Sequence, residues 1–261
     1  MPRTIVKTRG IVLRSRRMGE TSRITTLYTE DFGKLKVTAK GARRVKSKFG
    51  SALELMAEVQ AICYIRTALD LQTLSECELL TPPPVLSNDL QRFSFGNAAI
   101  ELIDGLTIEG EANKRLYQCL RGVLRGLEEV DPTQVESLFW YYELRVLDAL
   151  GYSPELRQCV ACRRGLIGAW LWFSPAQGGG MCAACGQGHG MRLPGESLQF
   201  LAHLQALKTY AKDVLPPTPT RRGEIRAALS AFVDYYGSGR GHLRSLHFME
   251  SLSGEPSALN S

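Results

Sequence analysis

Three consecutive prolines at positions 82–84 divide the chain and limit what can form on either side of them. Proline lacks a backbone N–H and has a fixed φ, so this run continues neither a β-ladder nor a helix. Before the prolines, short β-branched runs alternate with turn residues; after them, apolar residues recur at helical spacing. The sequence therefore predicts a multidomain α+β chain, with a β-rich N-terminal module over residues 1–80 and helices beyond it.

The N-terminal module contains five expected strands. They run over residues 4–17, 22–29, 34–42, 53–66 and 69–79, with glycines marking the bends between them. Five short strands at this spacing fit a small closed barrel of the oligonucleotide-binding type, the OB-fold, although an SH3-like barrel has the same signature. We therefore expect an OB-fold barrel over residues 1–80.

Helical segments on both sides of a glycine-rich insertion make up the rest of the chain. They are expected over residues 88–104, 111–130, 133–150, 196–215, 221–236 and 242–252. The third is the best marked, because Asp131, Pro132 and Gln134 form a capping-box pattern and Gly151 ends it. We expect a helical domain in two parts, 81–152 and 194–252, with a module inserted at 153–193 and a flexible tail at 253–261.

Two Cys-x-x-Cys pairs lie in the insertion, nineteen residues apart. This spacing is typical of tetrahedral zinc modules and predicts one Zn²⁺ bound by four thiolates, those of Cys159, Cys162, Cys182 and Cys185. A redox role for the pairs and ligation by His189 are the alternatives. Four cysteines already complete the tetrahedron, so the predicted site is structural. The other three cysteines are expected to be small buried side chains.

Positive charge is concentrated near the N-terminus. Residues 1–50 contain 14 Lys/Arg against 3 Asp/Glu, whereas the whole chain has a net charge of only +6. Such a module favours a polyanion partner, with a solvated basic face as the alternative. In the third strand, period 2 places lysines on one face, and a loop with four more cations follows. The candidate DNA-binding residues are Arg14, Arg16, Arg17, Lys34, Lys36, Lys40, Arg43, Arg44, Lys46 and Lys48.

Aromatic residues interleaved with these cations are candidates for stacking on bases. Phe32 and Phe49 lie beside turn glycines and are the better candidates, whereas Tyr28 and Tyr64 fit core packing equally well. A barrel that holds bases in this way binds single strands without reading their sequence.

The sequence carries no pattern typical of an enzyme. It has no Walker-type glycine loop, no His-Glu-x-x-His pair and no carboxylate cluster, so we expect no catalytic residues. The alternatives are a zinc-dependent nucleic-acid enzyme, which would need an open zinc position, and an RNA-binding protein. Apolar runs are too short to cross a bilayer and no signal peptide opens the chain, so we expect a cytoplasmic protein without membrane contact.

Several landmarks resemble the family of the bacterial recombination mediator RecO, in the same order along the chain. They are Gly10-Ile11-Val12-Leu13, Gly19-Glu20, Leu27-Tyr28-Thr29-Glu30, Gly33-Lys34-Leu35, Lys40-Gly41-Ala42-Arg43-Arg44, Leu150-Gly151-Tyr152-Ser153-Pro154, the four cysteines and Leu243-Arg244-Ser245-Leu246. The resemblance implies a nucleoid-associated protein that binds single- and double-stranded DNA, anneals complementary strands and assists recombinase loading.

The same resemblance implies two protein partners, RecR and the single-strand-binding protein. We expect the helical domain to receive the acidic C-terminal tail of the single-strand-binding protein. Arg121 and Arg125, beside Leu120 and Leu124, are candidates to hold it, with solvated surface as the alternative. Some relatives lack the four cysteines, which implies that zinc supports the fold.

Overall fold

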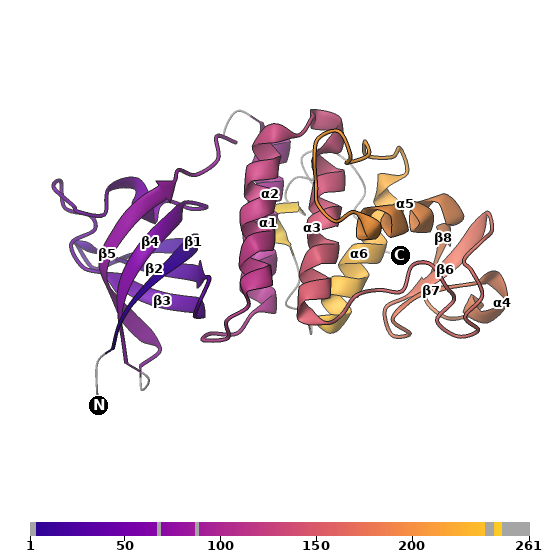
Figure 1. Ribbon diagram of the computed structural model, residues 1–261, viewed down its shortest axis with the longest axis horizontal. Coiled ribbons are helices and arrows are strands. Elements are labelled where there is room, and N and C mark those ends of the chain that lie inside the picture. Colours follow the sequence, from indigo (N-terminus) through magenta and orange to yellow (C-terminus); the bar gives the residue numbers. More distant parts are fainter. Residues whose placement is uncertain (1–3, 67–68, 87–88, 238–242, 247–261) are drawn as a thin grey trace. The chain divides into compact units, whose positions relative to one another are not determined.

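The computed structural model describes residues 4–66, 69–86, 89–237 and 243–246 (Figure 1). The chain divides into two compact units. The first contains residues 1–88 and 106–128, and the second contains residues 89–105 and 129–261. The chain therefore passes between the units three times. The predicted helix over 242–252 and the tail at 253–261 lie outside the described residues, apart from positions 243–246.

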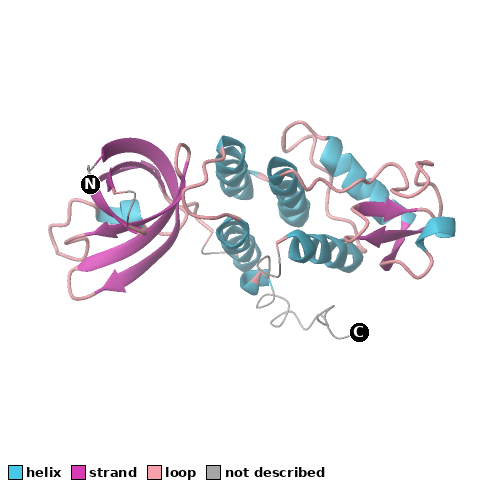
Figure 2. Cartoon of the chain, turned by 90° about the horizontal axis from the view of Figure 1, so that it is seen from below, coloured by secondary structure: helices cyan, strands magenta, loops and turns pink. Residues whose placement is uncertain are grey.

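Five strands form the first unit's sheet, as the sequence predicts. They are β1 (Thr4–Met18), β2 (Ser22–Thr29), β3 (Gly33–Ala39), β4 (Glu58–Ile65) and β5 (Leu71–Thr81). They pair in the order β1-β2-β3-β5-β4 as a closed barrel, which Figure 2 shows as strongly curved strands. All pairs are antiparallel except β3 with β5. Closure leaves no long sheet edge open to pairing with another chain.

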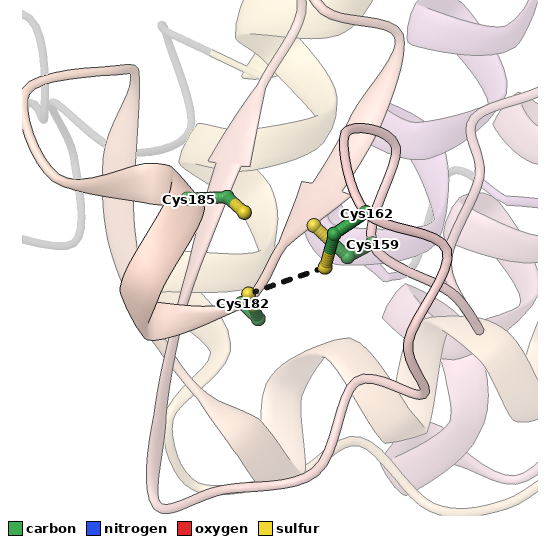
Figure 3. A group of neighbouring side chains, drawn as sticks. All are labelled: Cys159, Cys162, Cys182 and Cys185. Atoms are coloured by element: carbon green, nitrogen blue, oxygen red, sulfur yellow. Dashed lines mark hydrogen bonds between the residues drawn. The ribbon is translucent and has the colours of Figure 1, made fainter.

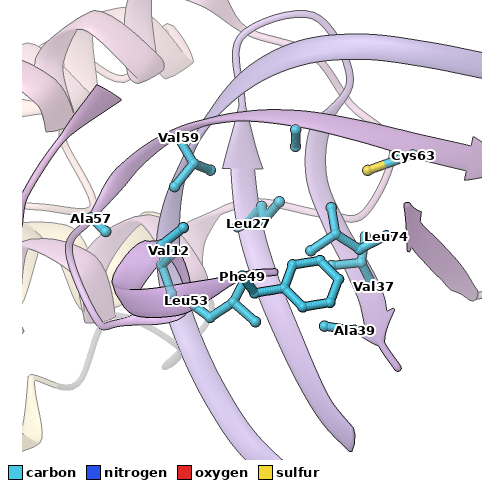
Figure 4. Packing of buried hydrophobic residues seen from close by; sticks show 12 residues of the cluster. Val12, Leu27, Val37, Ala39, Phe49, Leu53, Ala57, Val59, Cys63 and Leu74 are labelled. Carbon is cyan, nitrogen blue, oxygen red and sulfur yellow. The ribbon is translucent and has the colours of Figure 1, made fainter. Parts of the chain in front are cut away.

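A 3₁₀ turn, η1 (Gly50–Leu53), interrupts the region predicted as the start of the fourth strand. Its Leu53 and the preceding Phe49 are 1% and 3% exposed and pack with Val12, Leu27 and Val59 in the barrel core (Figure 4). The fourth strand therefore begins only at Glu58, five residues later than predicted. The expectation that Phe49 stacks on bases is wrong, because its ring belongs to this core.

Helix α2 (Lys114–Glu129) also belongs to the first unit. It is fastened to the barrel by Glu58, which is 5% exposed. The Glu58 carboxylate accepts hydrogen bonds from the hydroxyls of Tyr117 (2.8 Å) and Thr81 (2.9 Å) and pairs with Arg121 (3.0 Å). The boundary predicted at residue 80 placed this helix with the helical domain, whereas the structure groups it with the barrel.

The segment before α2 crosses the outside of the barrel. The Gly110 N–H donates to the Lys34 carbonyl at 3.1 Å, and the Tyr28 hydroxyl donates to the Asn113 carbonyl at 3.4 Å. Gly33 has φ +62°, and a Cβ added there would overlap the backbone carbonyl of Glu111. Glycine is therefore required at this β-turn both by its backbone conformation and by the close approach of the crossing segment.

Helices form most of the second unit. They are α1 (Leu90–Leu106), α3 (Val135–Leu150), α5 (Gly195–Ala206) and α6 (Arg222–Tyr236). α3 is buried along most of its length, and its Phe139 packs against Phe95 of α1 with ring centroids 5.0 Å apart. The predicted capping box of Asp131 and Gln134 and the stop at Gly151 are confirmed.

Helix α5 ends at Ala206, nine residues earlier than predicted. The chain after it is irregular, with a turn at residues 212–214, and the Gln134 amide before α3 donates to the carbonyls of Lys212 (2.9 Å) and Leu215 (2.6 Å). These side-chain hydrogen bonds replace the helical ones, and the prolines that follow at 216 and 217 cannot continue a helix.

The inserted module folds around a small antiparallel sheet. Its strands are β6 (Trp170–Ser174), β7 (Gly179–Met181) and β8 (Met191–Pro194), in the order β7-β6-β8, and a short helix α4 (Ala183–Gly186) follows β7. Leu171 and Phe173 of β6 are buried, and Phe173 packs against Phe232 of α6. Across both units, none of the described helices is long and apolar enough to span a bilayer.

Candidate metal centre and nucleic-acid interface

The two cysteine pairs meet in the inserted module (Figure 3). All four sulfur atoms lie within 4.8 Å of one another, and Cys162 Sγ and Cys182 Sγ are 3.8 Å apart. A tetrahedron with Zn–S bonds of about 2.3 Å has edges of about 3.8 Å, so the cluster has the dimensions of a four-thiolate metal site. The predicted set Cys159, Cys162, Cys182 and Cys185 is therefore brought together as a candidate metal centre.

Local backbone geometry directs the cysteine side chains inward. The Cys159 N–H donates to the Arg164 carbonyl at 2.7 Å, and the N–H groups of Cys185 and Gly186 donate to the Cys182 carbonyl at 3.1 and 2.9 Å. Each pair is thus held in a tight turn. A Cβ added at Gly186 would overlap the Trp172 side chain, so this position also requires glycine for packing.

Arg164 supplies positive charge beside the cluster. Its Nε–H donates to Cys162 Sγ at 3.4 Å, and this hydrogen bond is the main reason that the pKa of the Cys162 thiol is lowered to about 6. A thiolate is the form of cysteine that binds metal, so the arginine favours ligation at neutral pH. His189, the alternative ligand, is exposed and is not part of the clustered group.

Most of the predicted DNA-binding cations lie at one end of the barrel. The exposed ones are Arg14, Arg16 and Arg17 on β1 and Lys40, Arg43, Arg44, Lys46 and Lys48 after β3. Arg43 joins the two groups, because its N–H donates to the Thr21 carbonyl (2.9 Å) and its guanidinium donates to the carbonyls of Gly19 (3.2 Å) and Glu20 (2.9 Å). This anchoring places the basic loop against the β1–β2 turn. We call these eight residues the basic end of the barrel.

The other two predicted cations do not form an open stripe on β3. Lys34 is 8% exposed, because the segment before α2 pairs with its backbone. Lys36 forms an ion pair with Glu109 of the same segment. The alternation in sequence correctly placed Val37 and Ala39 in the core and the lysines outside, but the outer face at Lys34 and Lys36 is occupied by another part of the chain.

A pocket beside Lys40 contains Arg66, a cation that was not among the candidates predicted from the sequence. It has a volume of about 250 Å³ and is lined by Lys40, Tyr64, Arg66, Leu69, Leu71, Gln72 and Thr73. The Gln72 side chain accepts from the Arg66 N–H at 2.8 Å and fixes the backbone there. Tyr64 is on β4 and Arg66 follows its last residue, Ile65, so continuing the strand's period 2 by one residue would have added Arg66 to the candidates.

Of the other candidate stacking residues, Tyr28 is fully buried, and burial is the main reason that its pKa is raised to about 12. Phe32 and Tyr64 are partly exposed. Of the four aromatic residues considered, Phe32 and Tyr64 therefore remain the candidates for stacking on bases.

Three of the expected tail-binding residues, Arg121, Leu124 and Arg125, line a small pocket of about 20 Å³ that also contains the carboxylates of Glu58 and Glu128. Leu120 and Leu124 are 0% and 5% exposed, and Arg121 is paired with Glu58. A different pocket lies on α1 of the second unit. It has a volume of about 290 Å³ and is lined by Leu90, Phe93, Ser94, Asn97, Arg244 and Ser245.

The fold and the sites define a class of protein. Its members have a basic β-barrel followed by a helical body, and a four-cysteine cluster is inserted in that body. Family models described as "Recombination protein O N terminal" and "Recombination protein O C terminal" match residues 1–83 and 87–247. The chain belongs to the RecO family of DNA repair proteins.

Curated relatives agree with this membership over nearly the full length. A protein named "DNA repair protein RecO" from Moorella thermoacetica is 30% identical, covering 94% of this chain and 91% of the relative. Relatives of the same name from a Nocardioides species and from Streptomyces avermitilis are 33% and 34% identical, and each covers 92% of this chain and 97% of its own length.

Proposed function

We propose that this protein is a recombination mediator that binds single- and double-stranded DNA, anneals complementary strands and assists recombinase loading together with RecR and the single-strand-binding protein. The observation that carries the proposal is the basic end of the barrel, where Arg43 fastens two groups of exposed cations together. Concentrated, accessible cations bind the phosphate backbone and release its counterions. Two complementary strands are then held with much of their mutual repulsion neutralised.

The barrel supports an OB-fold assignment. Its five strands close in the order β1-β2-β3-β5-β4, and Leu53 of the 3₁₀ turn and the preceding Phe49 pack in the barrel core. Small closed barrels of this type hold oligonucleotides on their outer surface and in their loops. The pocket near Lys40 is lined by an aromatic ring, that of Tyr64, and by two cations, Lys40 and Arg66, a combination that fits a single strand.

We infer that the four-cysteine cluster binds one Zn²⁺ in a structural role. Four sulfur ligands in tetrahedral dimensions suit this ion, and they leave no position for a reactive water. The metal would stabilise a module whose own apolar core is small. A closed site of four thiolates disfavours the zinc-dependent enzyme, and we propose no catalytic residue.

We propose that the pocket on α1 receives the acidic tail of the single-strand-binding protein. Leu90 and Phe93 are 53% and 46% exposed and offer an apolar surface, and Arg244 supplies a cation for a carboxylate. Ser245 holds this arginine's segment on α1, because its N–H and hydroxyl both donate to Glu101, at 3.1 and 3.0 Å. An apolar floor beside an arginine is the combination that recognises a chain-terminal carboxylate.

Salt-dependent DNA binding tests the main proposal. We expect the quadruple variant Arg16→Ala, Arg17→Ala, Arg44→Ala, Lys46→Ala to fold normally, to anneal complementary strands poorly and to lose about 3 from the slope of log affinity against log salt, since each single-strand phosphate contact contributes about 0.7. Lys36→Ala is the control, because its ion pair with Glu109 already holds this cation. If the quadruple variant kept its affinity and slope, the DNA site would lie elsewhere.

A parallel competition between DNA and RNA separates the proposal from an RNA-binding function. We expect DNA strands to compete for the basic end of the barrel at least as well as RNA of the same sequence. A strong preference for RNA would contradict the proposed role in recombination.

A further inference from the structure

The small sheet of the inserted module has one open face. Leu171 and Phe173 of β6 point into the second unit and are 1% and 0% exposed. Period 2 therefore places Trp170 and Trp172 on the opposite face. Trp172 is partly covered, because its side chain packs beneath Gly186 of α4. Trp170 remains 42% exposed at the start of the strand.

An arginine from the neighbouring strand lies against this tryptophan. Arg192 of β8 is the cross-strand partner of Trp172, and its guanidinium carbon is 4.4 Å from the centre of the Trp170 ring. Trp170 is itself paired with Pro194, so two strands fix the position of the indole. Stacking of a planar guanidinium on an indole leaves the N–H donors at the edge of the plane, where they can bind phosphate.

The charge of the inserted module is mostly positive. Residues 153–193 contain four arginines, Arg157, Arg163, Arg164 and Arg192, and a single acid, Glu155. The Glu155 carboxylate accepts the backbone N–H groups of Arg157 (2.8 Å) and Gln158 (3.1 Å), so it is directed at the main chain. All four arginines are exposed. The open face thus combines the exposed Trp170 ring with the Arg192 cation, in a module of net positive charge, which is complementary to a base followed by a phosphate.

We propose that Trp170 and Arg192 form a second contact surface for single-stranded nucleic acid, on the four-cysteine module and separate from the barrel. One base stacks on the Trp170 indole, and Arg192 binds an adjacent phosphate. The proposal rests on the proposed DNA-binding function and deepens it, because it makes the module a binding element as well as a structural one. Since stacking tolerates every base, this contact does not read sequence.

Affinity measurements on the full-length protein test the two residues separately. We expect Trp170→Ala to weaken binding of oligo(dT) by about 5- to 150-fold with an unchanged salt slope, because a stacked base carries no charge. Arg192→Ala should instead reduce the salt slope by about 0.7. Ile167→Ala is the matched control, because this side chain is 87% exposed in the same module and carries no predicted contact.

Photocrosslinking uses the unaltered protein, so its result does not depend on whether the variants fold correctly. Oligonucleotides containing 5-bromodeoxyuridine should crosslink to the peptide that contains Trp170, as mapped by mass spectrometry. The inference would be overturned if Trp170→Ala bound oligo(dT) with unchanged affinity and no crosslink formed at that peptide. Arg192 would then only pack on the indole. If the unaltered protein bound no DNA at all, the proposed function itself would fail.

Discussion

Glu58 offers a direct test of how the barrel and α2 are held together. Its carboxylate is 5% exposed and accepts from two hydroxyls, those of Tyr117 and Thr81, while Arg121 of α2 pairs with it. The change Glu58→Ala removes all of these interactions at once. It leaves the hydroxyl of Tyr117, which is 1% exposed, without its acceptor.

The loss of stability expected for Glu58→Ala depends on how deeply Glu58 and Arg121 are each buried. Breaking a buried ion pair by removing one partner costs about 3–5 kcal/mol. The Arg121 side chain is 34% exposed and regains some hydration, so we expect a loss at the lower end, about 3 kcal/mol. The smaller change Tyr117→Phe removes one hydrogen bond to a charged acceptor and should cost about 1.5–3 kcal/mol.

Acid should remove the same stabilisation in the unaltered protein. Burial raises the pKa of Glu58, but hydrogen bonds from Tyr117 and Thr81 and the charge of Arg121 outweigh it, so the net pKa lies below the ordinary glutamate range. The unfolded state therefore takes up this proton at a higher pH than the folded state does. The stabilisation is present above the unfolded-state pKa and is lost as pH falls through the lower, folded-state pKa.

Two optical signals distinguish the units. All three tryptophans, Trp140, Trp170 and Trp172, lie in the second unit, so their fluorescence reports its unfolding, whereas far-ultraviolet circular dichroism reports both units. In guanidinium chloride, with an m-value of about 4 kcal/mol/M, a loss of 3 kcal/mol moves the first unit's midpoint by about 0.7 M. We expect Glu58→Ala to shift the dichroism transition and to leave the fluorescence transition in place.

Glu54→Ala is the control for this measurement. Glu54 pairs with Arg23 at 3.2 Å, but its side chain is 55% exposed, so its removal should cost less than about 1 kcal/mol. A shift in Glu58→Ala no larger than that of the control would refute the role assigned to the buried carboxylate. An equal shift of the fluorescence transition would refute independent unfolding of the two units.

Three further predictions concern the metal, the partner pocket and a buried acid. Elemental analysis should find about one zinc per chain. The double variant Cys159→Ser, Cys182→Ser should bind no zinc, and the melting temperature of its second unit should be lower. A metal-free protein of unchanged stability would contradict this prediction. Phe93→Ala and Arg244→Ala should each weaken binding of a peptide with the acidic tail sequence, whereas Arg125→Ala should not, as measured by fluorescence anisotropy. Full burial is the main reason that the pKa of Glu143 is raised to about 8, so its contribution to stability is lost as pH rises from the ordinary glutamate range through 8. Glu143→Gln should remove this pH dependence from the tryptophan-detected unfolding curve, and an unchanged dependence would show that Glu143 is not its source.

Features encoded by neighbouring residues could be predicted from the sequence. Alternation along β3 gave the inward set of Val37 and Ala39, and the capping box at Asp131 fixed the start of α3. The two cysteine pairs predicted their own cluster, because each Cys-x-x-Cys turn orients its thiolates locally and only one long connection has to close. Local periodicity and turn chemistry were sufficient in these cases.

Features that depend on distant parts of the chain were decided by the tertiary structure alone. The period of 2 along a strand shows which side chains point away from the core. It does not show which part of the outer surface another segment covers. The sequence therefore predicted Lys34 to be accessible, whereas the segment before α2 buries it. Glu58 and Tyr117 are far apart in sequence, and no local pattern pairs them, yet they place α2 with the barrel. The sequence by itself determined most of the helices and strands and the four cysteines that cluster. The accessible cations and the grouping of helices followed from long-range contacts, which form only when the chain closes on itself.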